Sequence, residues 1–223
     1  MAKNKLRKWS DMSTLPHVFQ ASGKEWITND HELKGHWNKN VFKNQHPIII
    51  ELGCGRGEYT IGLAKKFPEK NFIGIDIKGA RMWNGAMESF QHHMPNVAFL
   101  RTRIDFINSF FAPDEVDEIW LTFSDPQPRK ENKRLTSSLF IDKYKRLLKK
   151  NGIIHVKTDS DLLYAFTLAE IMKHNYQLHI SIADLYRSEI HDEELKSILH
   201  IRTFYEEMWL AKDISIKYIK FGL

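Results

Sequence analysis

The chain has 223 residues, of which 42% are hydrophobic and 27% are charged. Both proportions are close to those of soluble globular domains, so collagen-like, mucin-like and wholly disordered chains are excluded. The length suits one domain with a sizeable hydrophobic core, and the formal net charge of +5 favours an anionic partner.

The single cysteine, Cys54, excludes an internal disulfide and a cysteine-rich zinc site. The longest apolar run near the front covers only residues 48–50, whereas a membrane span needs roughly 18 to 20 residues. The basic first residues lead into no apolar stretch of the kind found in secretory signals. We therefore expect a cytoplasmic protein that binds no metal and does not enter a membrane.

Residues 1–46 are polar and show neither helical nor strand periodicity. Trp9, Trp26 and Trp37 are scattered among charged residues. Four basic residues lie near the start: Lys3, Lys5, Arg7 and Lys8. The segment is predicted to be a basic, partly flexible N-terminal arm outside the core, of a kind that could wrap an RNA backbone. Residues 47–223 are predicted to form a single domain.

From residue 47 the sequence alternates between short apolar runs and amphipathic stretches. Predicted strands cover 48–52, 71–76, 97–102, 118–123, 153–158, 176–182 and 214–221. Predicted helices cover 58–67, 78–93, 136–150, 162–174 and 202–212, and Gly152 is predicted to end the helix over 136–150. Repeated strand and helix units of this length require a mostly parallel sheet with helices on both faces, which is an α/β fold.

The first predicted strand runs into a glycine loop that opens a helix, where open α/β sheets bind nucleotide-like ligands. The pattern E-x-G-x-G-x-G is formed by Glu51, Gly53, Gly55 and Gly57. Glu58 stands where a dinucleotide fingerprint needs glycine, which counts against NAD. Asp76 ends the second strand at a spacing typical of an acid that binds a ribose diol. The combination favours S-adenosylmethionine, while a purely structural turn remains the alternative.

A second loop follows the predicted strand over 118–123. In it, Pro126 and Pro128 fix the backbone around Asp125. A stiff loop that presents a carboxylate beside a cofactor could accept hydrogen bonds from purine N–H groups. A proline-bracketed turn with aspartate as its cap is the structural alternative.

The charge that follows is concentrated. Residues 127–150 hold nine basic and two acidic side chains, which gives +7 against +5 for the whole chain. The nine are Arg129, Lys130, Lys133, Arg134, Lys143, Lys145, Arg146, Lys149 and Lys150. A solvated helix face is the usual explanation of such a run, but its place next to the crevice favours contacts with RNA phosphates.

With these features in place, the chain resembles the bacterial tRNA (guanine-N7)-methyltransferases, which are class I S-adenosylmethionine-dependent enzymes. The likeness runs from residue 51 to the C-terminus. It is carried by ELGCGRGEYT, GIDIKGAR, RTRIDF, TFSDPQPRKENKRLTSSLF, HVKTDSD and RTFYEE. The chain has Ser124 and Gln127 where the family often has proline and tryptophan.

The resemblance implies a Rossmann-like class I methyltransferase fold, with a mostly parallel sheet and a C-terminal antiparallel strand. It implies methyl transfer from S-adenosylmethionine, with S-adenosylhomocysteine as product, to guanine N7 of tRNA, at position 46 of the variable loop. The implied cofactor-binding residues are Glu51, Gly53, Gly55, Gly57, Asp76, Asp105 and Asp125, of which Asp125 is also catalytic. The implied substrate-binding residues are Arg129, Asp159, Thr203 and Glu206.

Two other functions are compatible with these motifs. One is an exocyclic-amine methyltransferase of DNA or RNA, although the second proline and the aromatic of its motif are misplaced after Asp125. The other is a non-catalytic RNA-binding protein with the same fold. A monomer that binds one tRNA is expected in place of an obligate oligomer.

Overall fold

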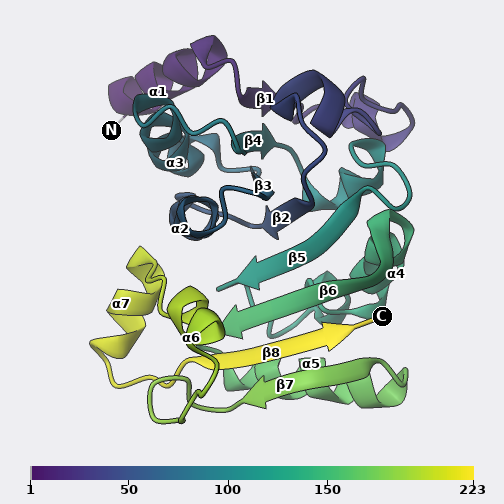
Figure 1. Cartoon of the computed structure of the whole chain (residues 1–223), viewed down its shortest axis with the longest axis vertical. Coiled ribbons are helices and arrows are strands. Elements are labelled where there is room, and N and C mark those ends of the chain that lie inside the picture. The colour runs from purple at the N-terminus through teal and green to yellow at the C-terminus, as the bar shows by residue number, and fades with distance from the viewer. Residues whose placement is uncertain (1) are drawn as a thin grey trace.

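The computed structural model describes the backbone of residues 2–223 and the side chains of residues 6–223. An eight-stranded sheet runs through the molecule in the order β1-β4-β3-β2-β5-β6-β8-β7 (Figure 1). Strands β1 to β6 pair in parallel, and β8 pairs antiparallel with both β6 and β7. The predicted α/β class, the mostly parallel sheet and the antiparallel C-terminal strand are confirmed.

The strands are β1 (Val18–Gln20), β2 (Ile48–Leu52), β3 (Asn71–Asp76), β4 (Val97–Arg101), β5 (Val116–Thr122), β6 (Leu148–Thr158), β7 (Gln177–Ile182) and β8 (Lys217–Gly222). The α-helices are α1 (Ala2–Thr14), α2 (Glu58–Lys66), α3 (Gly79–Gln91), α4 (Ser138–Leu147), α5 (Asp161–Lys173), α6 (Glu193–Leu199) and α7 (Phe204–Leu210). Shorter helical turns are η1 (Lys24–Ile27), η2 (Trp37–Phe42), η3 (Ile104–Ser109) and η4 (Glu131–Lys133). None of the helices in the described part of the chain is both long and apolar enough to cross a membrane.

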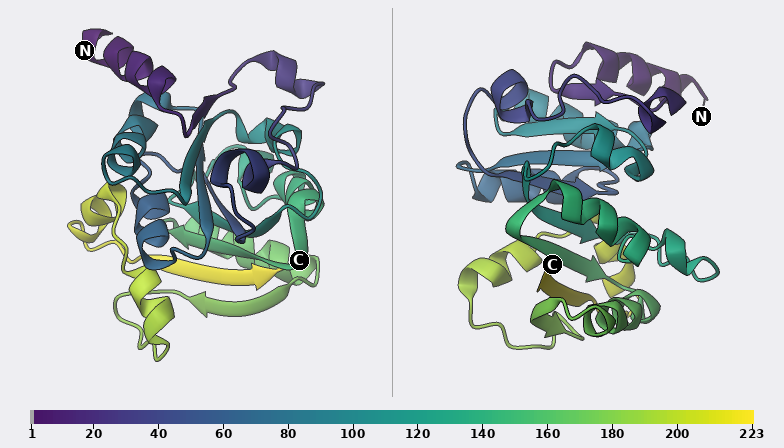
Figure 2. Two further views of the ribbon diagram at one scale, coloured as in Figure 1. Left: turned by 45° about the horizontal axis from the view of Figure 1, so that its top comes forward. Right: turned by 90° about the vertical axis from the view of Figure 1, so that its right-hand side faces the viewer.

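The sheet is covered by helices on both faces, as the two views of Figure 2 show. Successive residues of a strand point to opposite faces, so the continuous run Ile48–Ile50 serves two cores. Ile48 and Ile50 pack with side chains of η2, α4 and α5, whereas Ile49 packs with side chains of α1, α2, α3 and α6. Burial on both faces explains why this strand is apolar throughout.

The N-terminal segment is part of the core, so the expectation that residues 1–46 lie outside it is wrong. Trp37 is 0% exposed, and its indole Nε1 donates to the carbonyl of Phe110 at 2.8 Å. Met12 of α1 is buried against α3, and β1 adds an edge strand beside β4. The side chains of Lys3 and Lys5, predicted to belong to a basic arm, lie outside the described residues.

The predicted end of the helix over 136–150 is also wrong. Helix α4 stops at Leu147, and β6 begins at Leu148, which pairs with Val116 of β5. Asn151 takes the left-handed conformation, with φ of 68°, while Gly152 lies inside β6. Pairing with β5 therefore overrides the helical pattern of the last residues.

Candidate functional site

The glycine loop connects β2 to α2 with three left-handed residues. The φ angles of Gly53, Gly55 and Gly57 are 81°, 56° and 77°. A Cβ atom on Gly57 would lie 2.8 Å from the ring of Phe99, whereas one on Gly53 would meet no atom within 4 Å. Gly57 is thus required by packing, and the open space at Gly53 leaves the backbone accessible to a ligand.

Asp76 lies at the carboxyl end of β3 and holds the glycine loop. Its Oδ2 accepts from the backbone N–H of Gly55 at 3.0 Å, and its Oδ1 accepts from the backbone N–H of Lys78 at 2.7 Å. Each carboxylate oxygen has two lone-pair sites, so Asp76 can accept further hydrogen bonds from a ribose diol. The glycine loop and Asp76, both predicted to bind the cofactor, are therefore in direct contact.

A cleft of about 450 Å³ opens beside Asp76. Its lining includes Asp76, the last residue of β3, and Thr102 and Asp105, which follow β4. The lining also includes Gln127, Lys130 and Lys133, which belong to the segment after β5. Asp105 is paired with Arg103 at 3.1 Å and with Lys133 at 3.8 Å. The cleft thus brings two predicted cofactor residues next to the basic run.

Glu51 is buried beneath the glycine loop, near the carboxyl end of β2. Its carboxylate accepts from the backbone N–H of Thr60 at 2.9 Å and from the hydroxyls of Thr60 and Thr122. Burial raises the pKa of Glu51 from its ordinary value of 4.5 to about 7, although the hydrogen bonds from the two threonines act in the opposite direction. Glu51 therefore fixes the end of β2 to α2 and β5.

The loop after β5 presents Asp125 to solvent. The Oδ1 atom of Asp125 accepts from the backbone N–H of Gln127 at 2.9 Å, which forms a tight turn. Arg134 is only 2% exposed, and its Nε donates to the carbonyl of Pro126 at 2.9 Å. Arg134 holds this loop from inside, so the expectation that it lies in an RNA-binding surface with its neighbours is wrong.

The rest of the basic run divides into side chains near the cleft and side chains farther along the chain. Arg129, Lys130 and Lys133 are exposed next to the cleft. Lys149 lies 2.8 Å from Asp117, and Lys145 lies 3.7 Å from Asp142. Exposed positive charge therefore stands near the cleft at Arg129 and Lys130, while Lys133, Lys145 and Lys149 each lie close to an acidic side chain.

The remaining predicted substrate residues lie beside the carboxyl end of β6. Asp159 follows β6 and is half-buried, and burial raises its pKa. Its backbone carbonyl accepts from Lys217 Nζ at 2.8 Å. Asp159 therefore lies at the edge of the sheet where β5 also ends.

Thr203 and Glu206 form a capping box at the start of α7. The Thr203 hydroxyl accepts from the backbone N–H of Glu206 at 3.2 Å, and Glu206 Oε2 accepts from the backbone N–H of Thr203 at 3.4 Å. The Glu206 carboxylate lies 2.8 Å from Lys157 Nζ, and both side chains are 0% exposed. Burial lowers the pKa of Lys157 to about 8, while the Glu206 charge acts in the opposite direction. Both predicted residues are thus held by protein groups.

Helix α7 also contacts the glycine loop. Its first residue, Phe204, donates its backbone N–H to Glu58 Oε2 at 3.1 Å. Arg56, inside the loop, places its guanidinium carbon 3.9 Å from the centre of the Phe204 ring. The late RTFYEE motif therefore lies against the ELGCGRGEYT motif, although the two bonded residues are 146 positions apart in the chain.

The comparisons with known proteins agree with this geometry. The family described as "Putative methyltransferase" matches residues 45–218. A tRNA (guanine-N(7)-)-methyltransferase from Bacteroides fragilis is 53% identical over 223 residues, which are 100% of this chain and 87% of the relative. The chain belongs to the tRNA (guanine-N7)-methyltransferase family.

Solved structures place this family member among the class I methyltransferase folds. The 16S rRNA methyltransferase KamB has a TM-score of 0.65 at 10% identity, over 86% of this chain and 95% of its own. A 16S rRNA (adenine(1408)-N(1))-methyltransferase solved with its cosubstrate SAM has a TM-score of 0.55 at 11% identity, over 84% of this chain and 90% of its own. At these identities the likeness concerns the fold alone.

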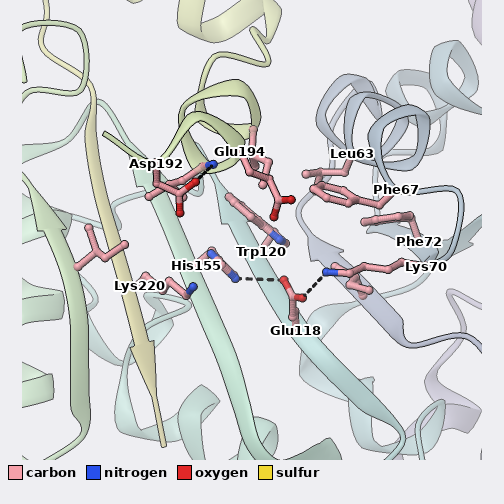
Figure 3. Close-up of a pocket in the computed structure, with 14 residues that line it drawn as sticks. Leu63, Phe67, Lys70, Phe72, Glu118, Trp120, His155, Asp192, Glu194 and Lys220 are labelled. Atoms are coloured by element: carbon pink, nitrogen blue, oxygen red, sulfur yellow. Dashed lines mark hydrogen bonds and ion pairs between the residues drawn. The ribbon is translucent and has the colours of Figure 1, made fainter. Parts of the chain in front are cut away.

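A second pocket, of about 150 Å³, lies on the face of the sheet that α2 and α6 cover (Figure 3). Glu118 stands between His155 Nε2 at 3.2 Å and Lys70 Nζ at 3.0 Å. Burial raises the pKa of Glu118, but the interactions with His155 and Lys70 outweigh it and lower the pKa to about 2. None of the described residues that line this pocket was predicted from the sequence to bind cofactor or substrate.

Sequence reasoning missed the residues that hold the site together. Glu58 accepts from the backbone N–H of Phe204, and Lys157 donates to the carbonyl of Leu199. Arg134 donates to the carbonyl of Pro126 within the same loop region. The signal for Lys157 was present, because a lysine inside a predicted buried strand needs a partner. The identity of that partner is set only by the fold.

Proposed function

We propose that this chain transfers a methyl group from S-adenosylmethionine to N7 of guanine at position 46 in the variable loop of tRNA. The observation that carries the proposal is that one cleft is lined by Asp76 and Asp105 together with Gln127, Lys130 and Lys133. The two carboxylates suit a small nucleoside that donates the methyl group. The two lysines suit a polyanionic acceptor. The names of the curated relatives support tRNA as the acceptor.

The residues present fit S-adenosylmethionine. Asp76 would accept hydrogen bonds from the ribose diol, and the open backbone at Gly53 would allow close approach of the ligand. Asp105 lies along the same wall and would bind the adenine end. When bound, this group supplies an activated methyl on a sulfonium. Glu51 would act indirectly, by fixing the strand and helix that carry the loop.

The chemistry proposed for the acceptor places few demands on the protein. Guanine N7 carries an in-plane lone pair, so no general base has to remove a proton before the methyl group is transferred. Orientation of the purine is therefore the main task, and a well-oriented pair of reactants gains a large rate factor from position alone. Methylation leaves a positive charge on the purine, which the carboxylate of Asp125 can stabilise.

Binding of the tRNA backbone falls to the basic side chains near the cleft. Arg129, Lys130 and Lys133 are exposed there and can reach phosphates. Asp159 lies at the neighbouring strand end and would accept hydrogen bonds from the purine N–H groups. Thr203 and Glu206 would shape that side of the site through the start of α7.

The proposal is tested with Asp125→Asn, which removes the charge and keeps the size of the side chain. We expect methyl transfer to an unmodified tRNA transcript to fall at least about tenfold, with tRNA affinity changed less than about twofold. Asp114→Asn is the matched control, because Asp114 is exposed and lies in a loop before β5. Normal turnover by Asp125→Asn would remove Asp125 from the catalytic residues.

The position of the target is tested with a second transcript that carries adenosine in place of guanosine at position 46. We expect no methyl transfer to this transcript and full transfer to the parent. Equal transfer to both transcripts would show that another guanine is the target.

A further inference from the structure

Helix α7 presents two aromatic side chains that are paired with arginines. Phe204 is 43% exposed, although phenylalanine is ordinarily buried. The guanidinium carbon of Arg56 lies 3.9 Å from the centre of its ring, and that of Arg81 lies 5.7 Å from the centre of the Tyr205 ring. The two rings are 5.7 Å apart and nearly perpendicular. Phe204 and Arg81 are exposed, whereas Arg56 and Tyr205 are half-buried. Aromatic residues and arginine are the residue types enriched at binding surfaces.

This cluster adjoins the proposed cofactor loop without belonging to the cleft. Arg56 is part of the loop, and the Phe204 backbone is bonded to Glu58 directly after it. None of the four residues, all of them described in the structure, is among those that line the cleft. Figure 1 shows α7 and the basic helix α4 on opposite sides of the view. The cluster therefore lies beside the glycine loop, on the side of the view opposite to α4.

The helix that carries the cluster is fixed by a buried polar network. Lys157 Nζ donates to the carbonyl of Leu199 at 2.6 Å and to that of Ile201 at 3.1 Å, besides its pairing with Glu206. The hydroxyl of Tyr186 donates to Glu206 Oε1 at 2.7 Å. Buried ion pairs rarely add net stability, and their best-attested use is to specify one arrangement. Here the arrangement specified is the position of α7 against the glycine loop.

We propose that Phe204 and Tyr205, with Arg56 and Arg81, form a nucleobase-stacking surface for the tRNA, and this inference rests on the proposed function. Aromatic rings and guanidinium planes both stack on unpaired bases. Two arginines beside the rings give the surface the charge that suits a polyanion. The Lys157 and Glu206 pair acts as a positioning device, because it touches none of the stacked groups and holds the helix that carries them.

The first test replaces the ring and keeps its apolar character. Phe204→Leu is expected to weaken binding of unmodified tRNA about tenfold, whereas Phe204→Tyr retains near-normal binding. Phe90→Leu is the matched control, because Phe90 is 47% exposed on α3 and lies away from the glycine loop. Equal tRNA affinity of Phe204→Leu and Phe90→Leu would overturn the proposal.

Salt dependence separates stacking from phosphate contacts. Phe204→Leu is expected to leave the slope of log affinity against log salt unchanged, while Arg56→Gln lowers its magnitude by about 1. A slope that changes with Phe204→Leu would show that the variant disturbs the charged contacts and not a stacked base, which would contradict the proposal.

The positioning role is tested with Lys157→Met, which removes the lysine of the 2.8 Å ion pair with Glu206. Lys70→Met is the control, because it removes the lysine of the 3.0 Å ion pair with Glu118. In Lys157→Met, amide hydrogen exchange of residues 204–210 should rise about 100-fold and tRNA affinity should fall. Binding of S-adenosylhomocysteine should fall less than tRNA affinity, because no residue of α7 lines the cleft. Unchanged exchange in α7 would refute the positioning role. The binding and exchange measurements require no turnover, so they test the stacking surface separately from the proposed function. The proposed function would be refuted if the unaltered protein transferred no methyl group to tRNA.

Discussion

Glu51 offers the sharpest test of how the glycine loop is held. Its carboxylate is buried among the donors of Thr60 and Thr122, and its pKa rises from 4.5 to about 7. A folded-state pKa above the unfolded value means that the contribution of Glu51 to stability is complete below pH 4.5 and is lost as the pH rises to about 7. At about 1.4 kcal/mol for each pKa unit, the loss is on the order of 3 kcal/mol.

The perturbation is Glu51→Gln, which keeps the shape of the neutral side chain and does not titrate. We compare the free energy of unfolding of this variant with that of the unaltered protein at each pH. The variant minus the unaltered protein should rise by about 3 kcal/mol between pH 4.5 and pH 7 and stay constant above pH 7. Urea unfolding followed by tryptophan fluorescence at a series of pH values measures this difference. Other titrating groups are present in both proteins and cancel.

Glu118→Gln is the matched control, because Glu118 is a partly buried carboxylate whose pKa is lowered to about 2. Glu118 itself does not titrate between pH 4.5 and pH 7, so this variant should not show the rise of about 3 kcal/mol expected for Glu51→Gln over that range. A difference for Glu51→Gln that stays constant over pH 4.5 to 7 would refute the assignment of Glu51 as a buried acid with a raised pKa.

Two further substitutions test the groups that shape the site. Gly57→Ala should lower the free energy of unfolding by about 1 to 3 kcal/mol, because φ is 77° and the new Cβ would lie 2.8 Å from the Phe99 ring and 3.2 Å from Gly85 Cα. Urea unfolding measures this loss, and Gly53→Ala is the control because a Cβ there meets open space. Equal losses in the two variants would contradict the prediction. Arg134→Met should cost about 1 to 3 kcal/mol and slow methyl transfer, because the Pro126 carbonyl loses its donor. Full activity of Arg134→Met with unchanged stability would show that the Asp125 loop holds its shape unaided.

Local sequence was sufficient where the partners of an element lie close in the chain. The loop from Gly53 to Gly57 and the strand ending at Asp76 form one strand, helix and strand unit, and the hydrogen bond from Gly55 to Asp76 closes it. The elements predicted over 48–102 accordingly agree with β2, α2, β3, α3 and β4 to within one or two residues.

Local sequence was insufficient where the partners are distant. The three tryptophans of the N-terminal segment show no period, yet Trp37 is buried against Phe110, 73 residues away. The same holds for Glu206, whose partner Lys157 lies on another element 49 residues earlier. Arg134 looked like one more surface cation because its burial depends on the fold of the Asp-Pro loop around it. Helix α6 was missed because its acidic first turn, with Asp192 as cap, resembles a polar linker.

The central claim is methylation of guanine N7, and one measurement tests it most directly. The purified protein is incubated with methyl-labelled S-adenosylmethionine and unmodified tRNA, and the labelled RNA is then treated with borohydride and aniline, which cleave the chain at N7-methylguanosine. We expect labelled tRNA that is cleaved at a single guanine. Label without cleavage would contradict the claim in favour of an exocyclic-amine product, and no label despite binding of the cofactor would contradict catalysis on tRNA.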